Sequence, residues 1–270
     1  MDFITGDCFK ILANFQYAPE TKNGEDYDNL QNTLDISKVK DNDIIYTHTF
    51  YAKKLFEIIS KIDTKLIIIT HNSDQNVDES YQLPDNVIKW YAQNVNVVNP
   101  RIESIPIGLE NDRWFPELRK KEKITNKNKE LIHFKNLVYM NHNIANNPAK
   151  RQPVYDLFKC KSWVTTEEGR NGQNFDGYID NIYHHKYVIC PEGNGMDTHR
   201  TWETLYLGTI PIEKRNINNF FHEDMPILLV DEWEEITESL LREKWADFFC
   251  NRNIKKLTFE YWKNKIVNHE

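Results

Sequence analysis

The chain has 270 residues, and its 34 lysines and arginines against 41 aspartates and glutamates give a formal net charge of −7. This acidic balance argues against wrapping of nucleic acid, whereas a small anionic ligand needs only local positive charge. With 40% hydrophobic residues, but no apolar run of about 18 residues and no signal-peptide pattern, the composition predicts a soluble cytoplasmic protein without a membrane span.

Short apolar runs alternate with amphipathic stretches in the first half of the chain, a pattern typical of α/β structure. The continuous run Leu66–Thr70 suits a strand that is covered on both faces within a parallel sheet. We predict strands at residues 44–47, 66–70, 95–98 and 104–107, and helices at residues 50–62 and 84–91, the second opened by Pro84.

A polar stretch without periodicity at residues 112–130 predicts a linker or a surface excursion, after which the α/β alternation resumes. The predicted organisation is an N-terminal domain at 1–120, a C-terminal domain at 121–252, and a helix at 253–270 that packs back on the first domain. The second half is expected to hold strands at 137–140, 163–165, 187–190, 209–212 and 227–230, and helices at 148–158, 197–207, 234–249 and 254–267.

The most informative segment is KYVICPEGNGMDTHRTWETLYLGTIPI, residues 186–212, which predicts a strand, a glycine-containing turn, a helix and a strand. The turn follows the carboxyl end of a strand, where open α/β sheets bind ligands. Gly193 and Gly195 allow the backbone to approach a ligand closely. His199 and Arg200 fall in the first helical turn, where cations are unfavourable against the helix dipole, so we expect an anion to offset them.

Two acidic residues of this segment have expected roles. Asp197, as the predicted helix N-cap, offsets the cations in part, and a bound phosphate would offset them better. Glu203 lies three residues beyond Arg200 on the same helix face, where a carboxylate accepts hydrogen bonds from a ribose diol. A plain turn and a surface ion pair would explain each feature separately, but their conjunction favours a nucleotide diphosphate site. The segment holds neither a Walker A motif nor a full dinucleotide fingerprint.

The segment Tyr187–Ile212 resembles the donor-binding segment of exostosin-like glycosyltransferases (glycosyltransferase family 47 and relatives). In that family a glycine turn is followed by Arg, Glu and Gly-x-Ile-Pro. Val138–Asn141 and Arg151 resemble the opening of the family's donor domain. The resemblance implies a GT-B fold, in which two doubly wound Rossmann-like domains face each other across a cleft. The chain length is also similar to that of small glycosyltransferases of large algal DNA viruses, which include a β-xylosyltransferase.

The resemblance implies an inverting transfer of a sugar from a nucleotide sugar, with UDP-xylose suggested by the viral likeness, to a hydroxyl of a glycan acceptor. By position, Glu203 would bind the ribose, and Arg200 with the helix N-terminus would bind the diphosphate. Arg151 is a candidate for a second phosphate contact. The other donor-side candidates are Glu192, Gly193, Asn194, Gly195, Asp197, Thr198 and His199.

An inverting transfer requires a general base, which is expected from the first domain just past the carboxyl ends of its strands. Asp74, after the strand at 66–70, is the first candidate for the base, and His71 is the second. His48, after the strand at 44–47, is a candidate on the acceptor side. Loop capping by Asp74 and structural hydrogen bonds of the two histidines are the alternative interpretations.

No metal ion and no cofactor besides the donor are expected, because arginines and helix N–H groups can stabilise a leaving diphosphate. Asp41–Asp43 has the letters of an Asp-x-Asp metal motif, but it precedes a strand and is interpreted as a turn. Two alternatives stay open from the sequence: a non-catalytic carbohydrate-binding module, and another nucleotide-dependent transferase such as a sulfotransferase. The oligomeric state cannot be predicted.

Overall fold

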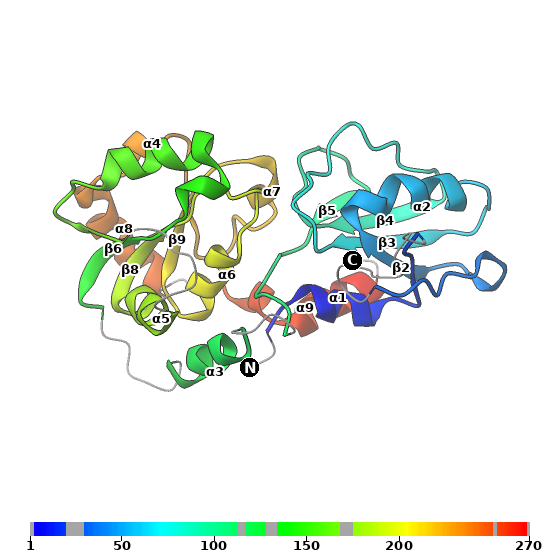
Figure 1. Ribbon diagram of the computed structural model, residues 1–270, viewed down its shortest axis with the longest axis horizontal. Helices are drawn as coiled ribbons and strands as arrows, with labels where there is room; N and C mark the ends of the chain where they lie inside the picture. Colours follow the sequence, from blue (N-terminus) through cyan, green and yellow to red (C-terminus); the bar gives the residue numbers. More distant parts are fainter. Residues whose placement is uncertain are drawn as a thin grey trace.

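The computed structural model describes residues 3–19, 30–112, 117–127, 134–167, 175–250 and 253–268. The described chain forms two units side by side, each built on a five-stranded sheet with helices on both faces (Figure 1). All strand pairs within the two sheets are parallel. The predicted α/β class with two parallel-sheet units is confirmed.

The first sheet has the strand order β1-β2-β3-β4-β5, so its strands are arranged in chain order. The strands are β1 (Phe15–Gln16), β2 (Asp43–His48), β3 (Leu66–His71), β4 (Val87–Ala92) and β5 (Ile102–Ser104). Every residue of β3 is buried, as the apolar run predicted for a strand covered on both faces.

Neighbouring residues of the first sheet's strands pack into two different layers. Ile68 belongs to the cluster that contains α2 (Ala52–Ile59), whereas Ile67 belongs to the cluster that contains α1 (Gly6–Leu12) and α9 (Phe259–Val267). The two helices from distant parts of the sequence lie beside each other on one face of the sheet (Figure 1). The first unit is therefore assembled from two separate stretches of the chain.

The second sheet has the strand order β10-β9-β8-β6-β7. Its strands are β6 (Asn136–Met140), β7 (Val164–Thr166), β8 (His185–Ile189), β9 (Ile210–Lys214) and β10 (Leu228–Val230). The chain passes from β6 outward to β7 and then returns to the other side of β6 with β8, so the order reverses between β6 and β8. A crevice beyond the carboxyl ends of these two strands is the switch point where open α/β sheets bind ligands.

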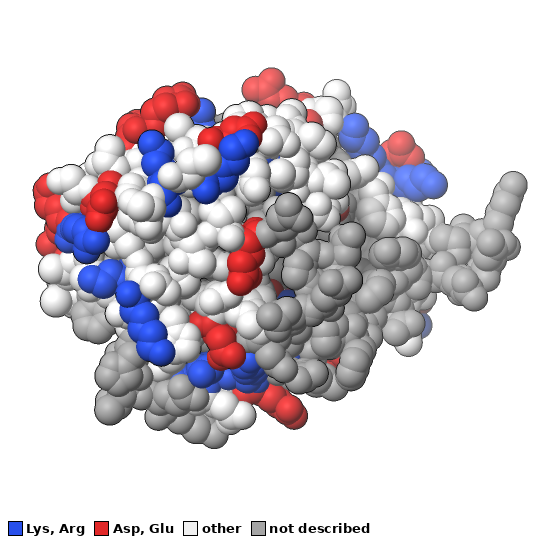
Figure 2. All heavy atoms as spheres, turned by 60° about the vertical axis from the view of Figure 1, so that its left-hand side comes forward, with Lys and Arg blue, Asp and Glu red and all other residues white. Residues whose placement is uncertain are grey.

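Helices cover both faces of the second sheet. Its helices are α3 (Glu117–Lys127), α4 (Pro148–Phe158), α5 (Phe175–His184), α6 (His199–Tyr206), α7 (Ile217–Phe220) and α8 (Glu238–Cys250). Side chains of α5 and α6 share one buried cluster, and side chains of α4 and α8 share the other. None of the described helices is long and apolar enough to cross a bilayer. On the face shown in Figure 2, the described acidic and basic side chains are interspersed.

Short 3₁₀ helices connect several of these elements. They are η1 (Ile36–Lys38), η2 (Thr49–Tyr51), η3 (Ile144–Asn146), η4 (Trp233–Glu235) and η5 (Lys255–Leu257). Because η5 precedes α9, the helix predicted at 254–267 is confirmed only from Phe259 onward.

Two predictions for the first half are wrong, and the strand predicted at 104–107 lies instead at Ile102–Ser104 (β5). Residues 84–91 were predicted as a helix but form a turn and most of β4. Asn86 explains the turn, because its side-chain amide donates hydrogen bonds to the carbonyls of Ile59, Ile62 and Thr64 at 2.9–3.0 Å. Residues 95–98 form no strand among the described residues, only the isolated bridge between Val77 and Val95.

The predicted linker at 112–130 instead contains α3, whose Ile124 is buried in the core of the second unit. The remainder of that stretch, at 113–116 and 128–130, lies outside the described residues.

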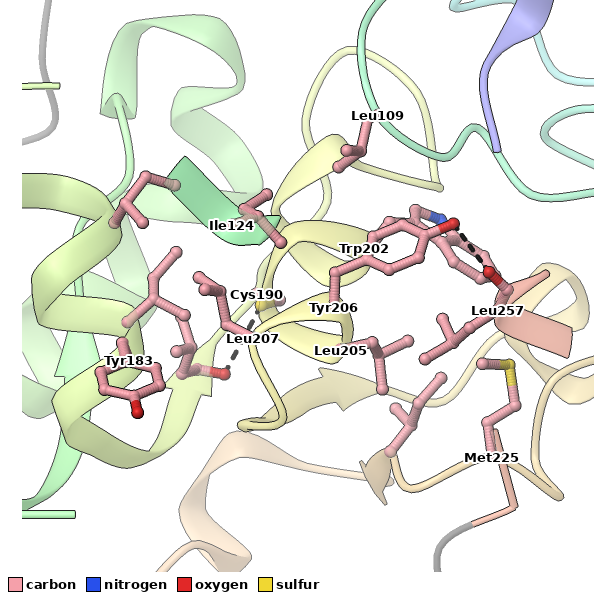
Figure 3. Close-up of a cluster of buried hydrophobic side chains, with 14 of the residues drawn as sticks. Leu109, Ile124, Tyr183, Cys190, Trp202, Leu205, Tyr206, Leu207, Met225 and Leu257 are labelled. Atoms are coloured by element: carbon pink, nitrogen blue, oxygen red, sulfur yellow. Dashed lines mark hydrogen bonds between the residues drawn. The ribbon is translucent and has the colours of Figure 1, made fainter. Parts of the chain in front are cut away.

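The hydroxyl group of Tyr206 joins the segments that run between the two units. It accepts a hydrogen bond from the backbone N–H of Ile4 at 2.9 Å. It also donates one to the carbonyl of Leu257 at 3.0 Å (Figure 3). The N–H of Leu109 in turn donates to the carbonyl of Ile4 at 2.8 Å. Three crossing segments are thus held together around one side chain of α6.

His222 is buried between the units, with its ring edge-on to Trp202 of α6 and Trp262 of α9. Neither ring nitrogen has a hydrogen-bond partner among the described residues. Burial lowers the pKa of His222 from 6.5 to about 3. The unfolded chain therefore takes up this proton at a higher pH than the folded chain, so the contribution of His222 to stability falls as the pH drops below about 6.5.

We predict that His222→Phe keeps the aromatic contacts and removes this titration. The native chain should lose stability as the pH is lowered from about 7 to about 4, and the variant should lose less. The stability of the variant minus that of the native chain should therefore increase over this range. Urea denaturation of both proteins over this range measures the difference. A difference that stays constant with pH would contradict the prediction.

Candidate active site

A cavity of about 640 Å³ lies between the two units. The first unit contributes residues that follow β3 and β5, and the second contributes residues that follow β6 and β8 together with the start of α6. The cavity therefore lies at the carboxyl edges of both sheets and includes the switch point of the second. Its lining residues are Asp74, Ile107, Glu110, Lys120, Asn141, Asn143, Asn146, Arg151, Tyr178, Gly193, Asn194, Gly195, Asp197, Thr198, His199, Arg200 and Glu203.

Most of the residues singled out in the sequence are brought together in this cavity. Those that line it are Asp74, Arg151, Gly193, Asn194, Gly195, Asp197, Thr198, His199, Arg200 and Glu203. His48, His71 and Glu192 are not among the lining residues.

Arg151 lies in the first turn of α4, at the switch point. The helix begins at Pro148, and the side chain of Asn147 caps it by accepting a hydrogen bond from the N–H of Lys150. The guanidinium group donates from Nε to the carbonyl of Glu192 at 2.8 Å and from Nη1 to the carbonyl of Asn143 at 2.7 Å. Backbone carbonyls thus hold this side chain in place, and no carboxylate of the described residues forms an ion pair with it.

Arg200 is the second residue of α6, and its guanidinium group lies over the ring of Tyr178 at 5.2 Å from the ring centre. Its Nη1 atom is buried and has no hydrogen-bond partner among the described residues. A buried donor without a partner is unfavourable by about 1–3 kcal/mol, and by more when the group is charged. The arrangement therefore favours a ligand that accepts hydrogen bonds at this atom.

Positive charge accumulates around the two arginines. Burial and the neighbouring charge of Arg200 lower the pKa of Arg151 to about 10. The same two effects lower the pKa of His142, which follows β6, to about 4. A proton is thus disfavoured near Arg200, whereas an anion would be attracted.

His199, the first residue of α6, is held by the segment that crosses from the first unit. Its Nδ1 donates to the carbonyl of Gly108 at 2.8 Å, and its Nε2 lies 3.2 Å from a carboxylate oxygen of Glu110. Burial alone would lower the pKa of His199, but the bond and charge of Glu110 raise it to about 9. Burial alone would raise the pKa of Glu110, but His199 lowers it to about 2. Glu110 therefore supplies the anion expected for His199, whereas Arg200 forms no ion pair with a carboxylate of the described residues and has the Glu203 charge nearby.

Glu203 is buried in the wall of the cavity, and each of its carboxylate oxygens has one side-chain partner. The Lys120 ammonium group lies 2.6 Å from Oε1, and the Tyr178 hydroxyl donates to Oε2. Burial would raise the pKa of Glu203, but Lys120 and the hydrogen bonds hold it below its usual value. Glu203 is therefore charged at neutral pH.

Asp197 has a different role from the predicted N-cap of α6. The N-cap position belongs to Thr198, which makes no side-chain capping bond. The Asp197 carboxylate instead accepts hydrogen bonds from the backbone N–H of Ile107 at 2.7 Å and from Trp202 Nε1 at 2.8 Å. Burial raises the pKa of Asp197 to about 6. This side chain connects the start of α6 to the first unit.

The two glycines of the turn are explained by protein contacts. A Cβ atom at Gly193 would lie 2.9 Å from Arg151 Nη2, and one at Gly195 would lie 2.6 Å from Asn94 Nδ2. Asn94 accepts a hydrogen bond from the N–H of Asp197 at 2.8 Å, so the turn is docked on the first unit. The predicted close approach of the backbone thus serves an arginine and an asparagine side chain of this chain, and both glycines also line the cavity.

Asp74 is exposed at the first-unit side of the cavity, in the loop after β3. Its Oδ2 accepts a hydrogen bond from Asn194 Nδ2 at 3.3 Å. A carboxylate of the first unit and the glycine turn of the second therefore meet across the cavity, and the role of Asp74 as base stays a prediction.

The interpretation of His71 as a second base candidate is not supported by its position. His71 is buried, its Nδ1 accepts a hydrogen bond from the N–H of Asn72 at 2.8 Å, and its Nε2 lies 3.0 Å from the carbonyl of Pro106. Burial lowers its pKa below the usual value. Both nitrogens are used, so the alternative of a structural histidine fits the contacts.

Two other predicted residues lie away from the cavity. His48 is buried at the end of β2, against the rings of Phe50 and Tyr51. The Glu192 carboxylate is directed to Asn216 Nδ2 at 3.2 Å and Lys150 Nζ at 3.5 Å, so only its carbonyl contributes, through Arg151. Adjacent residues of an extended segment face opposite sides. The Glu192 side chain therefore points away from the cavity, and Gly193 lines it.

Asp41–Asp43 forms a turn, as predicted. Asn42 has a φ of 70°, and the two flanking carboxylates accept hydrogen bonds from the N–H groups of Lys65 and Lys40 at 2.8 Å. Within the described ranges, no group of three or more His, Cys, Asp or Glu side chains could hold a metal ion. Independence from metal stays a prediction.

The sequence analysis missed several cavity residues. Lys120 lies in the stretch interpreted as a linker, and Tyr178 and Glu110 lie outside every motif. Glu110 could have been predicted, because it is a carboxylate that follows the strand ending at Ser104, and ligands bind at the carboxyl edge of the sheet. Lys120 has no such signal, since its partner Glu203 is distant in the sequence.

No family model matches this chain, and no curated protein does. Among solved structures, the chain is similar to the DNA-modifying enzyme β-glucosyltransferase, which was crystallised in the presence and absence of its substrate uridine diphosphoglucose. The sequences are 11% identical, the match covers 87% of this chain and 84% of that one, and the TM-score is 0.35. These comparisons assign the chain to no family.

We predict that Gly195→Ala weakens the docking of the turn on the first unit, because the new Cβ would displace Asn94 and its bond to Asp197. The expected loss of unfolding free energy is about 1–3 kcal/mol, as for other overpacked positions. Urea denaturation measures it. Asn194→Ala, at the exposed neighbouring position, is the control and should change stability by less than about 0.5 kcal/mol. Equal stability of both variants would contradict the docking role of Gly195.

Proposed function

We propose that this chain is a glycosyltransferase that binds a nucleoside diphosphate sugar at the switch point of its second sheet. The observation that carries the proposal is the pair of guanidinium groups of Arg151 and Arg200. Neither has a carboxylate partner among the described residues, and a buried Nη1 of Arg200 has no partner of any kind there. A diphosphate would supply acceptor oxygens and the missing negative charge, because charge-assisted bonds from arginine to phosphate are strong and directional.

The surroundings of the arginines favour a nucleotide sugar over a simple phosphate. Glu203, one helical turn beyond Arg200, is charged and lines the cavity, where it would accept hydrogen bonds from the ribose hydroxyls. The cavity of about 640 Å³ has room for a nucleoside, a diphosphate and a sugar, since ligand pockets usually measure about 300–1,000 Å³. The resemblance of residues 187–212 to exostosin-like glycosyltransferases supports the same class and makes UDP-xylose the first donor to test.

The proposed reaction is an inverting transfer to a hydroxyl of a glycan acceptor. The acceptor oxygen attacks the anomeric carbon, the bond from that carbon to the diphosphate oxygen breaks, and the electron pair leaves with the diphosphate. Asp74 takes the proton of the attacking hydroxyl. Arg200, Arg151 and the N–H groups at the start of α6 stabilise the charge that develops on the leaving group, so the step as proposed requires no metal.

We predict that Arg200→Ala weakens the binding of UDP about 10- to 150-fold, which corresponds to the loss of a hydrogen bond from a charged donor. Isothermal titration calorimetry with UDP and with UDP-, GDP- and dTDP-sugars measures affinity and nucleotide preference. Arg215→Ala is the matched control, because Arg215 forms a surface ion pair with Asp231 at 3.1 Å. This control variant should bind UDP with the affinity of the native chain.

Three outcomes of this titration would contradict the proposal. They are unchanged UDP binding by the Arg200 variant, absence of binding of any nucleotide sugar by the native chain, and binding of phosphoadenosine phosphosulfate alone. The last two would favour a carbohydrate-binding module and a sulfotransferase, respectively.

We predict that Asp74→Asn keeps UDP binding and loses transfer by about 100-fold or more, the usual contribution of general base catalysis. Release of UDP from UDP-xylose in the presence of a panel of methyl glycosides measures transfer. Asp63→Asn is the control, because Asp63 is exposed in the loop before β3 and does not line the cavity. This variant should keep full activity. Full turnover by the Asp74 variant would show that another group is the base.

A further inference from the structure

A second cavity, of about 460 Å³, opens on the first unit beside the loop that carries Asp74. One wall is formed by Phe50 of η2 and Lys53 of α2, and the other by the loop 75–81. These walls follow β2 and β3, and the carboxyl ends of neighbouring parallel strands meet at the same edge of a sheet. The cavity therefore lies on the same edge as Asp74, which immediately precedes its lining residue Gln75.

Phe50 gives this cavity an aromatic wall. Its side chain is 41% exposed, whereas His48, against which it packs at 5.1 Å between ring centres, is fully buried. Phe50 therefore presents part of its ring to the cavity that it lines. The C–H face of a sugar ring stacks on such an aromatic ring.

Polar groups face the ring across the cavity. Asp78 is held in position by the N–H of Ser80, which donates to its Oδ1 at 2.9 Å. The amide groups of Gln75 and Asn76 also line the cavity, and the Asn76 side chain forms no hydrogen bond to a described residue. Amide and carboxylate groups beside an aromatic ring offer the donors and acceptors that sugar hydroxyls require.

The charges of this region disfavour a polyanionic ligand. The carboxylates of Asp74 and Asp78 lie on the same loop, and they would repel a phosphodiester backbone. The single lysine of the cavity wall, Lys53, is already engaged, because its Nζ donates to Ser80 Oγ at 3.2 Å and lies 4.9 Å over the ring of Tyr81. A neutral ligand with several hydroxyl groups fits this set of side chains.

We infer that this cavity is an acceptor subsite that binds an uncharged sugar ring, stacked on Phe50 and bonded to the polar groups of loop 75–81. The inference rests on the proposed function and defines the class of its acceptor: a neutral glycan and not a nucleic acid. A sugar held here would present a neighbouring hydroxyl toward Asp74, one residue away from the cavity wall.

Saturation-transfer NMR on the full chain in the presence of UDP tests this inference. The probes are methyl glycosides of xylose, glucose, galactose and fucose, with a single-stranded and a double-stranded DNA oligonucleotide as the competing class. We expect at least one methyl glycoside to bind, and Phe50→Ala to weaken that binding about three- to tenfold, as for the loss of one aromatic contact. Phe220→Ala is the matched control, because Phe220 is 59% exposed and lines neither cavity described here.

The outcomes separate this inference from the proposed function. Binding of UDP without any methyl glycoside, or equal glycoside binding by Phe50→Ala and the native chain, would overturn the acceptor subsite and leave the donor site intact. Binding of DNA that Phe50→Ala weakens would overturn the neutral class of the ligand. Failure of the native chain to bind UDP would overturn the proposed function, whatever the glycosides do.

Discussion

The arrangement of the molecule depends on one electrostatic constraint, which is that Arg151 and Arg200 lie in the same cavity and neither forms an ion pair with a carboxylate of the described residues. Two other cations of the cavity each have a carboxylate partner within the protein. His199 is paired with Glu110, and Lys120 is paired with Glu203. The positive charge that is left is therefore local and specific, although the chain as a whole carries −7. Backbone carbonyls fix Arg151, and the ring of Tyr178 supports Arg200, so both side chains are positioned before a ligand binds.

The first unit completes this site by holding the turn that precedes α6. Asn94 accepts a bond from the N–H of Asp197, and Ile107 donates one to its carboxylate. The glycine turn is therefore shaped by contacts between the units as well as by its own sequence. This arrangement links the position of Arg200 to the packing of the two units, because Arg200 lies in the first turn of α6, three residues after Asp197.

Local patterns explain what could be predicted from the sequence, and contacts between distant residues explain what could not. The strand, turn and helix at 186–212 were predicted because their signals are close together in the chain. The roles of Lys120 and Glu110 were missed because each depends on a partner about 80 or more residues away. Pro84 misled the prediction for 84–91, since proline opens both helices and turns, and the three hydrogen bonds of Asn86 that decide between them are long-range.

The bond pattern around Tyr206 has a consequence for the order in which the molecule can fold during synthesis. One face of the first sheet is covered by Trp262 and Ile266 of α9, which the ribosome adds only after the entire second unit. Until then, the apolar face beside Ile67 has no cover from this helix, and the Tyr206 hydroxyl lacks Leu257 as its acceptor. The nascent first unit is therefore open to aggregation and to chaperone binding for the time that translation of about 150 further residues takes. The last helix closes the sheet that was made first.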